Sequence, residues 1–371
     1  MVSDAGPLGG LDPAREPGTQ QRPGGGRRSA PQGTRANGWP GQHGPTYAAL
    51  DLGTNNCRLL VARPAGDSFH VVDAFSRIIR LGEGISATGR ISETAISRAV
   101  DALSVCRDKM ANRDTTRARL IATEACRSAE NGEEFRSRIA EQVGLELEII
   151  DRETEACLAA TGCTALMASE ADGVVLFDIG GGSSELVLLG RSHPTKRGPP
   201  PPQIRAWASL PVGVVTLAER HGGIEVTRDS YEAMVLEVAG YIAPFLAANR
   251  DAMPGHVHLL GTSGTVTTIA GVHLNLRRYD RQRVDGCWMG DEQVTEVVER
   301  LLAMTYQERV ANPCIGAERA DLVLAGCAIL EAIRRAFPHP RLRVADRGLR
   351  EGMLVQMMRE DGVWKDEDAT A

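Results

Sequence analysis

Two acidic residues bracket a glycine-rich turn in the middle of the chain. An apolar run ends at Asp178, and Glu185 opens a second apolar run, within the segment GVVLFDIGGGSSELVLLG. The turn between them is made of Gly180, Gly181, Gly182 and Ser183. Glycines lack the Cβ that would keep a phosphate away from backbone N–H groups. The carboxylates would repel a bare phosphate but can hold Mg²⁺ against it, so the pattern predicts a metal-bound phosphate. A glycine-rich hairpin with exposed acidic ends is the structural alternative.

A second segment with the same pattern lies closer to the N-terminus. It reads AALDLGTNNCRLLVARP, in which an apolar strand ends at Asp51 and is followed by Gly53, Thr54, Asn55 and Asn56. A repeat at this separation predicts two related subdomains that face each other. We expect their two turns to hold one phosphate chain from opposite sides.

One carboxylate and one guanidinium are placed to do chemistry. Glu155 follows a strand end at the start of a helix and is the best candidate for a general base. Glu153, two positions earlier, points to another face. Stabilisation of the helix dipole is the default role of a glutamate at such a position, and the residues alone favour it. Arg127 could neutralise a transferred phosphoryl group or pair with Glu124 or Glu130.

A third turn, Gly261–Thr265, lies between a buried-type strand and a helix. Its small hydroxyl residues suit an anion at the helix N-terminus, although they are also common capping residues. Strands and helices alternate throughout. Helices are expected from Ser92 to Met110, Asn131 to Val143, Asp151 towards Ala168, Asp291 to Met304 and Ala317 to Ala336. This order predicts an α/β fold.

Composition limits the classes of function. The chain has 371 residues, 42% of them hydrophobic, which favours two domains with large cores. A net charge of −6 argues against a nucleic-acid-binding protein. No lysine follows a glycine and the eight cysteines form no C-x-x-C pair, so a Walker A loop and a zinc motif are not indicated. We expect no membrane segment and a cytoplasmic location with reduced thiols.

The first residues differ from the rest of the chain. Positions 1–45 are rich in glycine, proline, glutamine and arginine and hold few large apolar residues, so they are expected to be disordered. We expect two domains, 46–170 and 171–360, followed by a second disordered tail, 361–371.

Seven segments together resemble one known family. They read AALDLGTNNCRLL, ATEACRSAENGEEF, ETEACLAA, LFDIGGGSSEL, SLPVGVVTL, LLGTSGTVTTIAG and ADRGLREGML. Taken together they are similar to the exopolyphosphatase and guanosine pentaphosphate phosphohydrolase (Ppx/GppA) family, from about residue 47 to 359. That family belongs to the actin, sugar kinase and heat-shock chaperone superfamily. The resemblance implies two ribonuclease H-like α/β domains with a cleft between them.

The resemblance also assigns roles to individual residues. Thr54 and Asn55 match the first phosphate motif, and Gly180, Gly181, Gly182 and Ser183 match the second. Asp51, Asp178 and Glu185 match acidic positions that would hold Mg²⁺ or another divalent cation such as Mn²⁺. Arg127 matches a phosphate-binding arginine, Glu155 the catalytic glutamate, and Gly264 lies in the matching third loop. The motif around Glu155 departs from the family pattern at Arg152, Thr154 and Cys157, which leaves substrate preference open.

The implied function is release of terminal phosphate from inorganic polyphosphate, from the 5′ end of pppGpp, or from both, by in-line attack of water. An ATP-dependent small-molecule kinase of the same fold and a guanosine tetra- or pentaphosphate sensor without turnover remain as alternatives. Polyphosphate or a guanosine polyphosphate is thus the expected partner, with neither nucleic acid nor a membrane involved. A homodimer is left open.

Overall fold

The structure is a computed structural model that describes residues 44–193, 195, 197–253 and 255–364. The described residues belong to one compact unit. The strands are β1 (Tyr47–Leu52), β2 (Asn56–Ala65), β3 (Ser68–Ile78), β4 (Arg117–Ala122), β5 (Glu148–Ile149), β6 (Gly173–Ile179), β7 (Ser184–Gly190), β8 (Gln203–Leu210), β9 (Val257–Thr262), β10 (Trp288–Gly290) and β11 (Arg341–Val344).

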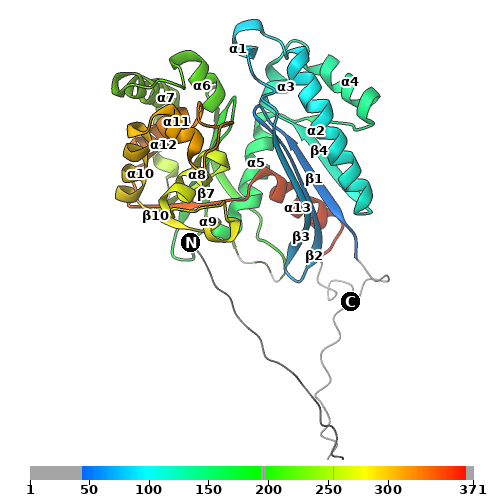
Figure 1. The fold of residues 1–371 in the computed structure, drawn as a ribbon. Coiled ribbons are helices and arrows are strands. Elements are labelled where there is room, and N and C mark those ends of the chain that lie inside the picture. Colours follow the sequence, from blue (N-terminus) through cyan, green and yellow to red (C-terminus); the bar gives the residue numbers. More distant parts are fainter. Residues whose placement is uncertain (1–43, 194, 196, 254, 365–371) are drawn as a thin grey trace, which may run out of the picture. The chain divides into compact units, whose positions relative to one another are not determined.

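Helices lie between and after these strands (Figure 1). They are α1 (Ile85–Thr88), α2 (Glu93–Asn112), α3 (Glu124–Ser128), α4 (Gly132–Val143), α5 (Arg152–Cys163), α6 (Val214–His221), α7 (Arg228–Asn249), α8 (Ser263–His273), α9 (Arg281–Val284), α10 (Asp291–Ala303), α11 (Tyr306–Ala311), α12 (Val323–Ala336) and α13 (Leu349–Glu360). Single 3-10 turns follow α5 (Thr164–Leu166) and α7 (Arg250–Ala252).

The two sheets repeat one topology. The first has the order β3-β2-β1-β4-β5, and the second has the order β10-β11-β9-β6-β7-β8. If β6, β7, β8, β9 and β11 are counted as one to five, both sheets have the order 3-2-1-4-5, with β10 added at one edge. In each sheet the first strand pairs antiparallel with the second and parallel with the fourth. This strand order is that of ribonuclease H-like folds, so the predicted α/β class and the predicted repeat are confirmed.

Strand register places the acidic residues at equivalent points. Asp51 on β1 lies opposite Arg58 on β2, and Asp178 on β6 lies opposite Glu185 on β7. The parallel neighbours β4 and β9 end beside β1 and β6. Carboxyl ends of parallel strands meet at one edge of a sheet, where α/β proteins bind ligands. Both aspartates lie at this edge.

The last helix returns to the first sheet. α13 packs against α5 and β1, and its residues Met353, Leu354, Met357 and Met358 join a buried cluster with residues of β1, β2 and β4. Glycines allow the α5–α13 contact, because a Cβ on Gly162 would lie 2.0 Å from the Gly348 carbonyl oxygen and one on Gly352 would lie 1.9 Å from that of Leu158. Backbones this close fix the two helices against each other.

Several expected boundaries move. The helix expected over 317–336 begins only at Val323, because residues 317–322 form turns that reach the pocket described below. Of residues 145–150 only Glu148 and Ile149 form a strand, β5, and α5 ends at Cys163, short of Ala168. The tail expected from residue 361 begins with residues that make contacts: Asp361 accepts a hydrogen bond from Tyr47, and Trp364 donates one to the Gly66 carbonyl. Positions 1–43 and 365–371 lie outside the described residues, and the division at residue 170 stays a prediction.

One helical stretch of the described residues, Arg228–Ala252, is long and apolar enough to cross a membrane, with a mean hydropathy of 1.3. Glu232 and Glu237 interrupt its apolar sequence. One face of α7 is packed into the core of the second sheet and against α12. A core helix satisfies the same length and hydropathy test, so this stretch is weak support for a membrane span.

Candidate functional site

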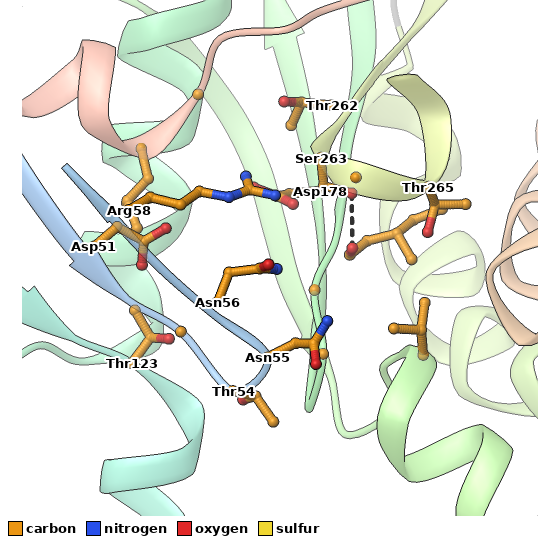
Figure 2. Close-up of a pocket in the computed structure, with 18 of the residues that line it drawn as sticks. Asp51, Thr54, Asn55, Asn56, Arg58, Thr123, Asp178, Thr262, Ser263 and Thr265 are labelled. Atoms are coloured by element: carbon orange, nitrogen blue, oxygen red, sulfur yellow. Dashed lines mark hydrogen bonds between the residues drawn. The ribbon is translucent and has the colours of Figure 1, made fainter. Parts of the chain in front are cut away.

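The predicted site residues converge on one pocket (Figure 2). Its walls come from both hairpin turns and from the N-terminal ends of α5, α8 and α13. Ten predicted residues line it: Asp51, Thr54, Asn55, Glu155, Asp178, Gly180, Gly181, Gly182, Ser183 and Glu185. Gly264 lines it as well, whereas Arg127 does not. The fold therefore brings the two halves of the repeat to a single cavity.

The hairpin turns approach each other closely in this pocket. A Cβ on Gly181 would lie 2.9 Å from Thr54 Cβ and 3.2 Å from the Asn55 backbone nitrogen. A Cβ on Gly182 would lie 2.9 Å from Thr54 Oγ1. Any larger residue would therefore push the two turns apart, since nine in ten real Cβ contacts are longer than 3.4 Å. The glycines permit close approach of backbone to backbone as well as to a ligand.

Burial alters the carboxylates of the second hairpin. Burial, with repulsion from Asp51, raises the pKa of Asp178 to about 6. Burial, with repulsion from Glu155 and Asp178, also raises the pKa of Glu185 well above its usual range, although Ser183 and Ser209 each donate a hydrogen bond to it at 2.8 and 2.9 Å. Buried carboxylates with raised pKa values favour the arrival of a cation, because a cation stabilises their ionised form.

Asp51 of the first hairpin has a different environment. Burial raises its pKa, while Arg58 and Arg350 oppose the shift. Figure 2 shows the Arg58 side chain extending from the first hairpin towards Asp178. Arg58 also lowers the pKa of Asp178, so one guanidinium acts on an aspartate of each hairpin.

Glu155 is held by an arginine. The Arg127 guanidinium donates to Glu155 Oε2 at 3.0 Å, to Glu124 Oε2 at 2.6 Å and to the Ile150 carbonyl at 2.6 Å. Burial raises the pKa of Glu155 to about 7, against the opposing effect of Arg127 and with repulsion from Asp51 and Asp178. A carboxylate that titrates near neutral pH suits a general base. Arg127 therefore pairs with Glu124, one of the two expected partners, and orients Glu155 in this structure.

Backbone strain marks the third turn. Ser263 has φ of 85° although it is not glycine, and its hydroxyl donates to the Ile179 carbonyl at 2.7 Å, which Figure 2 shows as a dashed line. Such conformations persist where surrounding structure imposes them, often at binding sites. The N-cap residue Thr262 makes no side-chain capping bond to α8 and instead donates to the Arg347 carbonyl at 2.6 Å.

Two arginines flank Gly264. A Cβ at this glycine would lie 3.6 Å from Arg58 Nη2 and 3.9 Å from Arg319 Nη1. Of the four arginines that line the pocket, Arg347 pairs with Asp285, whereas Arg58, Arg319 and Arg350 have no carboxylate within salt-bridge distance among the described residues. Guanidinium groups gathered in one pocket without carboxylate partners suit an anion.

The sequence prediction missed these three arginines. The signal for Arg58 was present, because it occupies in the first repeat the position of Glu185 in the second. Arg350 is in the quoted motif ADRGLREGML, whose residues were not assigned roles. Arg319 had no local signal, since its position was expected to be helical. Asn56 was also not assigned, although its Oδ1 atom, like that of Asn55, is buried and has no hydrogen-bond partner among the described residues.

The residues of the pocket can be tested for a divalent cation. Among the described residues, no group of three or more His, Cys, Asp or Glu side chains is already arranged around one point. The donor chemistry nevertheless fits a hard cation, which prefers carboxylate oxygens and completes its shell with water and phosphate oxygens. Glu185 is buried and Asp178 is half-buried, neither has a salt-bridged cation among the described residues, and Asp51 faces the same pocket.

The fold and site define a class: an α/β protein of duplicated ribonuclease H-like topology that gathers acidic and glycine-rich turns around one pocket. The sequence profile of the Ppx/GppA phosphatase family matches residues 60–361, and the chain belongs to this family. Membership confirms the resemblance drawn from the seven motifs. The protein is accordingly an enzyme of the phosphohydrolase class.

Relatives and solved structures agree with this assignment. The chain is 29% identical over 327 residues to exopolyphosphatase 2 of Mycobacterium tuberculosis, covering 84% of this chain and 98% of that protein. It is 27% identical to the guanosine-5′-triphosphate,3′-diphosphate pyrophosphatase of Aeromonas salmonicida, covering 88% of this chain but 62% of that protein. An exopolyphosphatase structure from Cytophaga hutchinsonii has a TM-score of 0.76 at 25% identity, covering 85% of this chain and 98% of that one. The Aquifex aeolicus family member has a TM-score of 0.69 at 27% identity, with coverage of 85% and 98%.

Proposed function

We propose that this protein releases terminal phosphate from inorganic polyphosphate, from the 5′ end of pppGpp, or from both, by divalent-cation-assisted attack of water. One observation carries the proposal: Glu155, whose pKa lies near 7, shares a single pocket with the acidic turns of both hairpins. The proposed cleft is the space between the halves 46–170 and 171–360, each taken as a domain. We further propose a cytoplasmic protein that binds neither nucleic acid nor membranes.

Glu155 acts as the general base. In its ionised form it orients a water molecule and accepts its proton as the water attacks the terminal phosphorus. A positioned base contributes about 10²–10⁴-fold in rate. Arg127 is a positioning residue in this structure, because its hydrogen bonds to Glu155 and Glu124 fix the carboxylate. Arg127 does not line the pocket in this structure, so its second proposed role, neutralising charge on the transferred group, requires its guanidinium to turn from Glu124 towards the substrate.

The substrate phosphates bind between the turns. Backbone N–H groups of Gly181–Ser183 and the polar residues Thr54 and Asn55 contact the phosphate chain from opposite sides, while the Gly180 N–H closes the turn on the Ser183 carbonyl. Gly264 leaves room for a phosphate oxygen, and Arg58 and Arg319 supply positive charge beside it. Bidentate guanidinium contacts suit phosphate oxygens and compensate for the surrounding carboxylates.

Mg²⁺, or Mn²⁺ in its place, would be held by Asp178 and Glu185, with Asp51 on the opposite side of the pocket. When bound, it would neutralise phosphoryl oxygens and offset the charge of the acidic residues. The carboxylates must be ionised to receive it, so a cation lowers the raised pKa values described above.

Polyphosphate is the first substrate to test, because the alignment spans 98% of the mycobacterial exopolyphosphatase and 62% of the guanosine pyrophosphatase. Phosphate release from long polyphosphate and from pppGpp should be measured side by side with Mg²⁺. Glu155→Gln should bind both ligands but lose about 10²–10⁴-fold in kcat. Glu153→Gln is the matched control, since Glu153 is exposed on the same helix turn and does not line the pocket.

Full activity in Glu155→Gln would refute the assignment of the base. ADP formation that depends on an added small molecule would favour the kinase alternative, for which no acceptor-activating aspartate is identified. Tight pppGpp binding with no phosphate released over hours would favour a sensor.

A further inference from the structure

An arginine-rich segment follows α8. Residues 277–283 read RRYDRQR, with four arginines and one aspartate in a chain whose net charge is −6. Three of them, Arg277, Arg278 and Arg283, are exposed. Among the described residues, none of the three is hydrogen-bonded to a side chain or within 4.0 Å of a carboxylate. We call these three residues the arginine strip.

Several other surface arginines are paired with carboxylates, whereas Arg77, Arg205 and Arg250 are exposed and have no carboxylate within 4.0 Å among the described residues. Arg136 pairs with Glu133, Arg228 with Glu299, and Arg335 with Glu232 at 2.6 Å. Neutralised surface arginines of this kind contribute little to ligand binding. The arginine strip differs in that three such arginines lie within the seven residues 277–283, which concentrates positive charge without a carboxylate within 4.0 Å among the described residues.

The segment is fixed to the wall of the pocket. The Tyr279 hydroxyl donates to Asp346 Oδ2 at 2.7 Å, and Arg281 donates to Glu351 Oε1 and to the Asp346 carbonyl, each at 2.6 Å. Asp346 and Glu351 both line the pocket. Figure 1 shows α9 beside α8, the helix whose first turn also lines the pocket. Tyr279 and Arg281 therefore attach the strip next to the site and leave its three arginines free.

We propose that the arginine strip is a second anion subsite, which binds phosphate groups of the substrate beyond the one being released. The inference rests on the proposed function. A phosphoanhydride chain carries about one negative charge per phosphate, and it must approach a protein of net negative charge and a pocket with several carboxylates. Local positive charge raises the concentration of such a ligand at the site and slows its departure.

The shared chemistry is a phosphate group at a distance from the reacting one, and two substrates can supply it. In polyphosphate it is a later unit of the chain. In pppGpp it is the 3′-diphosphate. Tripolyphosphate and GTP lack these distant groups and serve as the matched short ligands.

The experiment measures binding by the Glu155→Gln protein, in which turnover is suppressed. The strip variant adds R277Q, R278Q and R283Q, and the control variant adds R136Q, R228Q and R335Q, which removes the same net charge from paired arginines elsewhere. We expect the strip variant to bind polyphosphate of about 100 units at least ~10-fold more weakly, with a shallower dependence on salt. Binding of tripolyphosphate should change less than about twofold, and the control variant should bind both like the parent.

Each outcome has a defined meaning. Weaker binding of long polyphosphate or of pppGpp, with GTP and tripolyphosphate unchanged, supports the subsite and identifies which substrate uses it. Unchanged binding of both long polyphosphate and pppGpp overturns the proposal, as does an equal loss for tripolyphosphate or an equal loss in the control variant. Failure of the unmodified protein to release phosphate, with strip-dependent binding intact, rejects the proposed function alone.

Discussion

The two hairpins that form the pocket share a backbone but differ in charge. Both aspartates occupy the same register position, and both turns close with one hydrogen bond, from Gly53 N to the Asn56 carbonyl at 2.9 Å and from Gly180 N to the Ser183 carbonyl at 3.0 Å. Opposite Asp51 is Arg58, whereas opposite Asp178 is Glu185. The same hairpin backbone therefore presents an arginine in the first hairpin and a second carboxylate in the second hairpin.

This difference indicates a division of labour. The first hairpin, with a guanidinium and two amide side chains, is suited to phosphate oxygens, and the second, with two carboxylates, is suited to a metal ion. The difference also extends to space. The second turn needs glycine because it contacts the first, while a Cβ on Gly53 would have no neighbour closer than 3.6 Å.

The largest predicted effect compares Glu185 with Arg58, the oppositely charged residues at equivalent positions of the two hairpins. Glu185→Gln should lower kcat by about 10²–10³-fold, because the site loses one of its cation-binding oxygens. Arg58→Gln should mainly raise KM, by about 10-fold, because it removes charge that attracts the substrate. Steady-state phosphate release over a series of Mg²⁺ concentrations measures both. If the two variants alter the same parameter to the same extent, the division of labour is wrong.

The second prediction tests the difference in how closely the glycines of the two turns are packed. Gly181→Ala should lower phosphate release by about 10-fold or more, since Thr54 and Asn55 must move and misplace the reacting groups. Gly53→Ala, the matched control in the other hairpin, should change it only about twofold. Thermal unfolding of both variants shows whether each is folded at the assay temperature. Equal losses would mean that contact between the turns does not matter.

A smaller effect concerns pH and stability without metal. The pKa of Asp178 is about 6 in the folded protein against an ordinary value of 3.8, because of burial first and Asp51 second. The folded state therefore binds more protons than the unfolded state, so stability from this group is present at low pH and is lost as pH rises through about 6. In EDTA, as pH rises from 5.5 to 7.5, we expect the free energy of unfolding of the unmodified protein to fall by about 1 kcal/mol more than that of Asp178→Asn.

Asp51→Asn provides the comparison for this experiment. Arg58 and Arg350 oppose the rise of the Asp51 pKa, so its substitution should flatten the pH dependence less than that of Asp178. Denaturant unfolding at pH 5.5 and 7.5 measures the free energy of unfolding of each variant. A steeper dependence in Asp178→Asn than in the unmodified protein would show that the sign is reversed.

The smallest predicted effect comes from a substitution that gives the first turn the serine of the second. Asn56 occupies the position of Ser183 in the second turn. We expect Asn56→Ser to change kcat/KM less than about fivefold, because a hydroxyl also offers a donor and an acceptor there. A loss as large as that of Glu185→Gln would assign Asn56 a direct role with the reacting phosphate, which would extend the first hairpin's part in the chemistry.

Local features could be predicted from sequence because they depend on neighbouring residues. The Ser92 hydroxyl caps α2 through the Ala95 N–H at 3.2 Å, and the Asp151 carboxylate caps α5 through the Thr154 N–H at 2.7 Å. Asn131 precedes α4 as expected, yet its side chain bonds to the Ile91 backbone and does not cap the helix. The helix position follows from local pattern, but the partner of a side chain depends on the fold.

Most of the site could be predicted for the same reason, since its acidic and glycine residues are grouped in two repeated segments. Arg58 required the strand register, and Arg319 required knowledge that residues 317–322 leave the helix to reach the pocket. Arg127 pairs with Glu124, three residues away in the sequence, and with Glu155, 28 residues away. The second pairing depends on tertiary packing and has no signature in the local sequence.

The return of α13 to the first sheet has a consequence for biosynthesis. Ribosomes make a chain from its N-terminus, so β1, β2 and β4 emerge long before the methionines of α13 that cover one face of them. That face stays without its native cover until α13 has been translated. A nascent chain that stops short of α13 therefore holds the acidic turns but lacks the helix that packs against the first sheet and lines the pocket with its first turn.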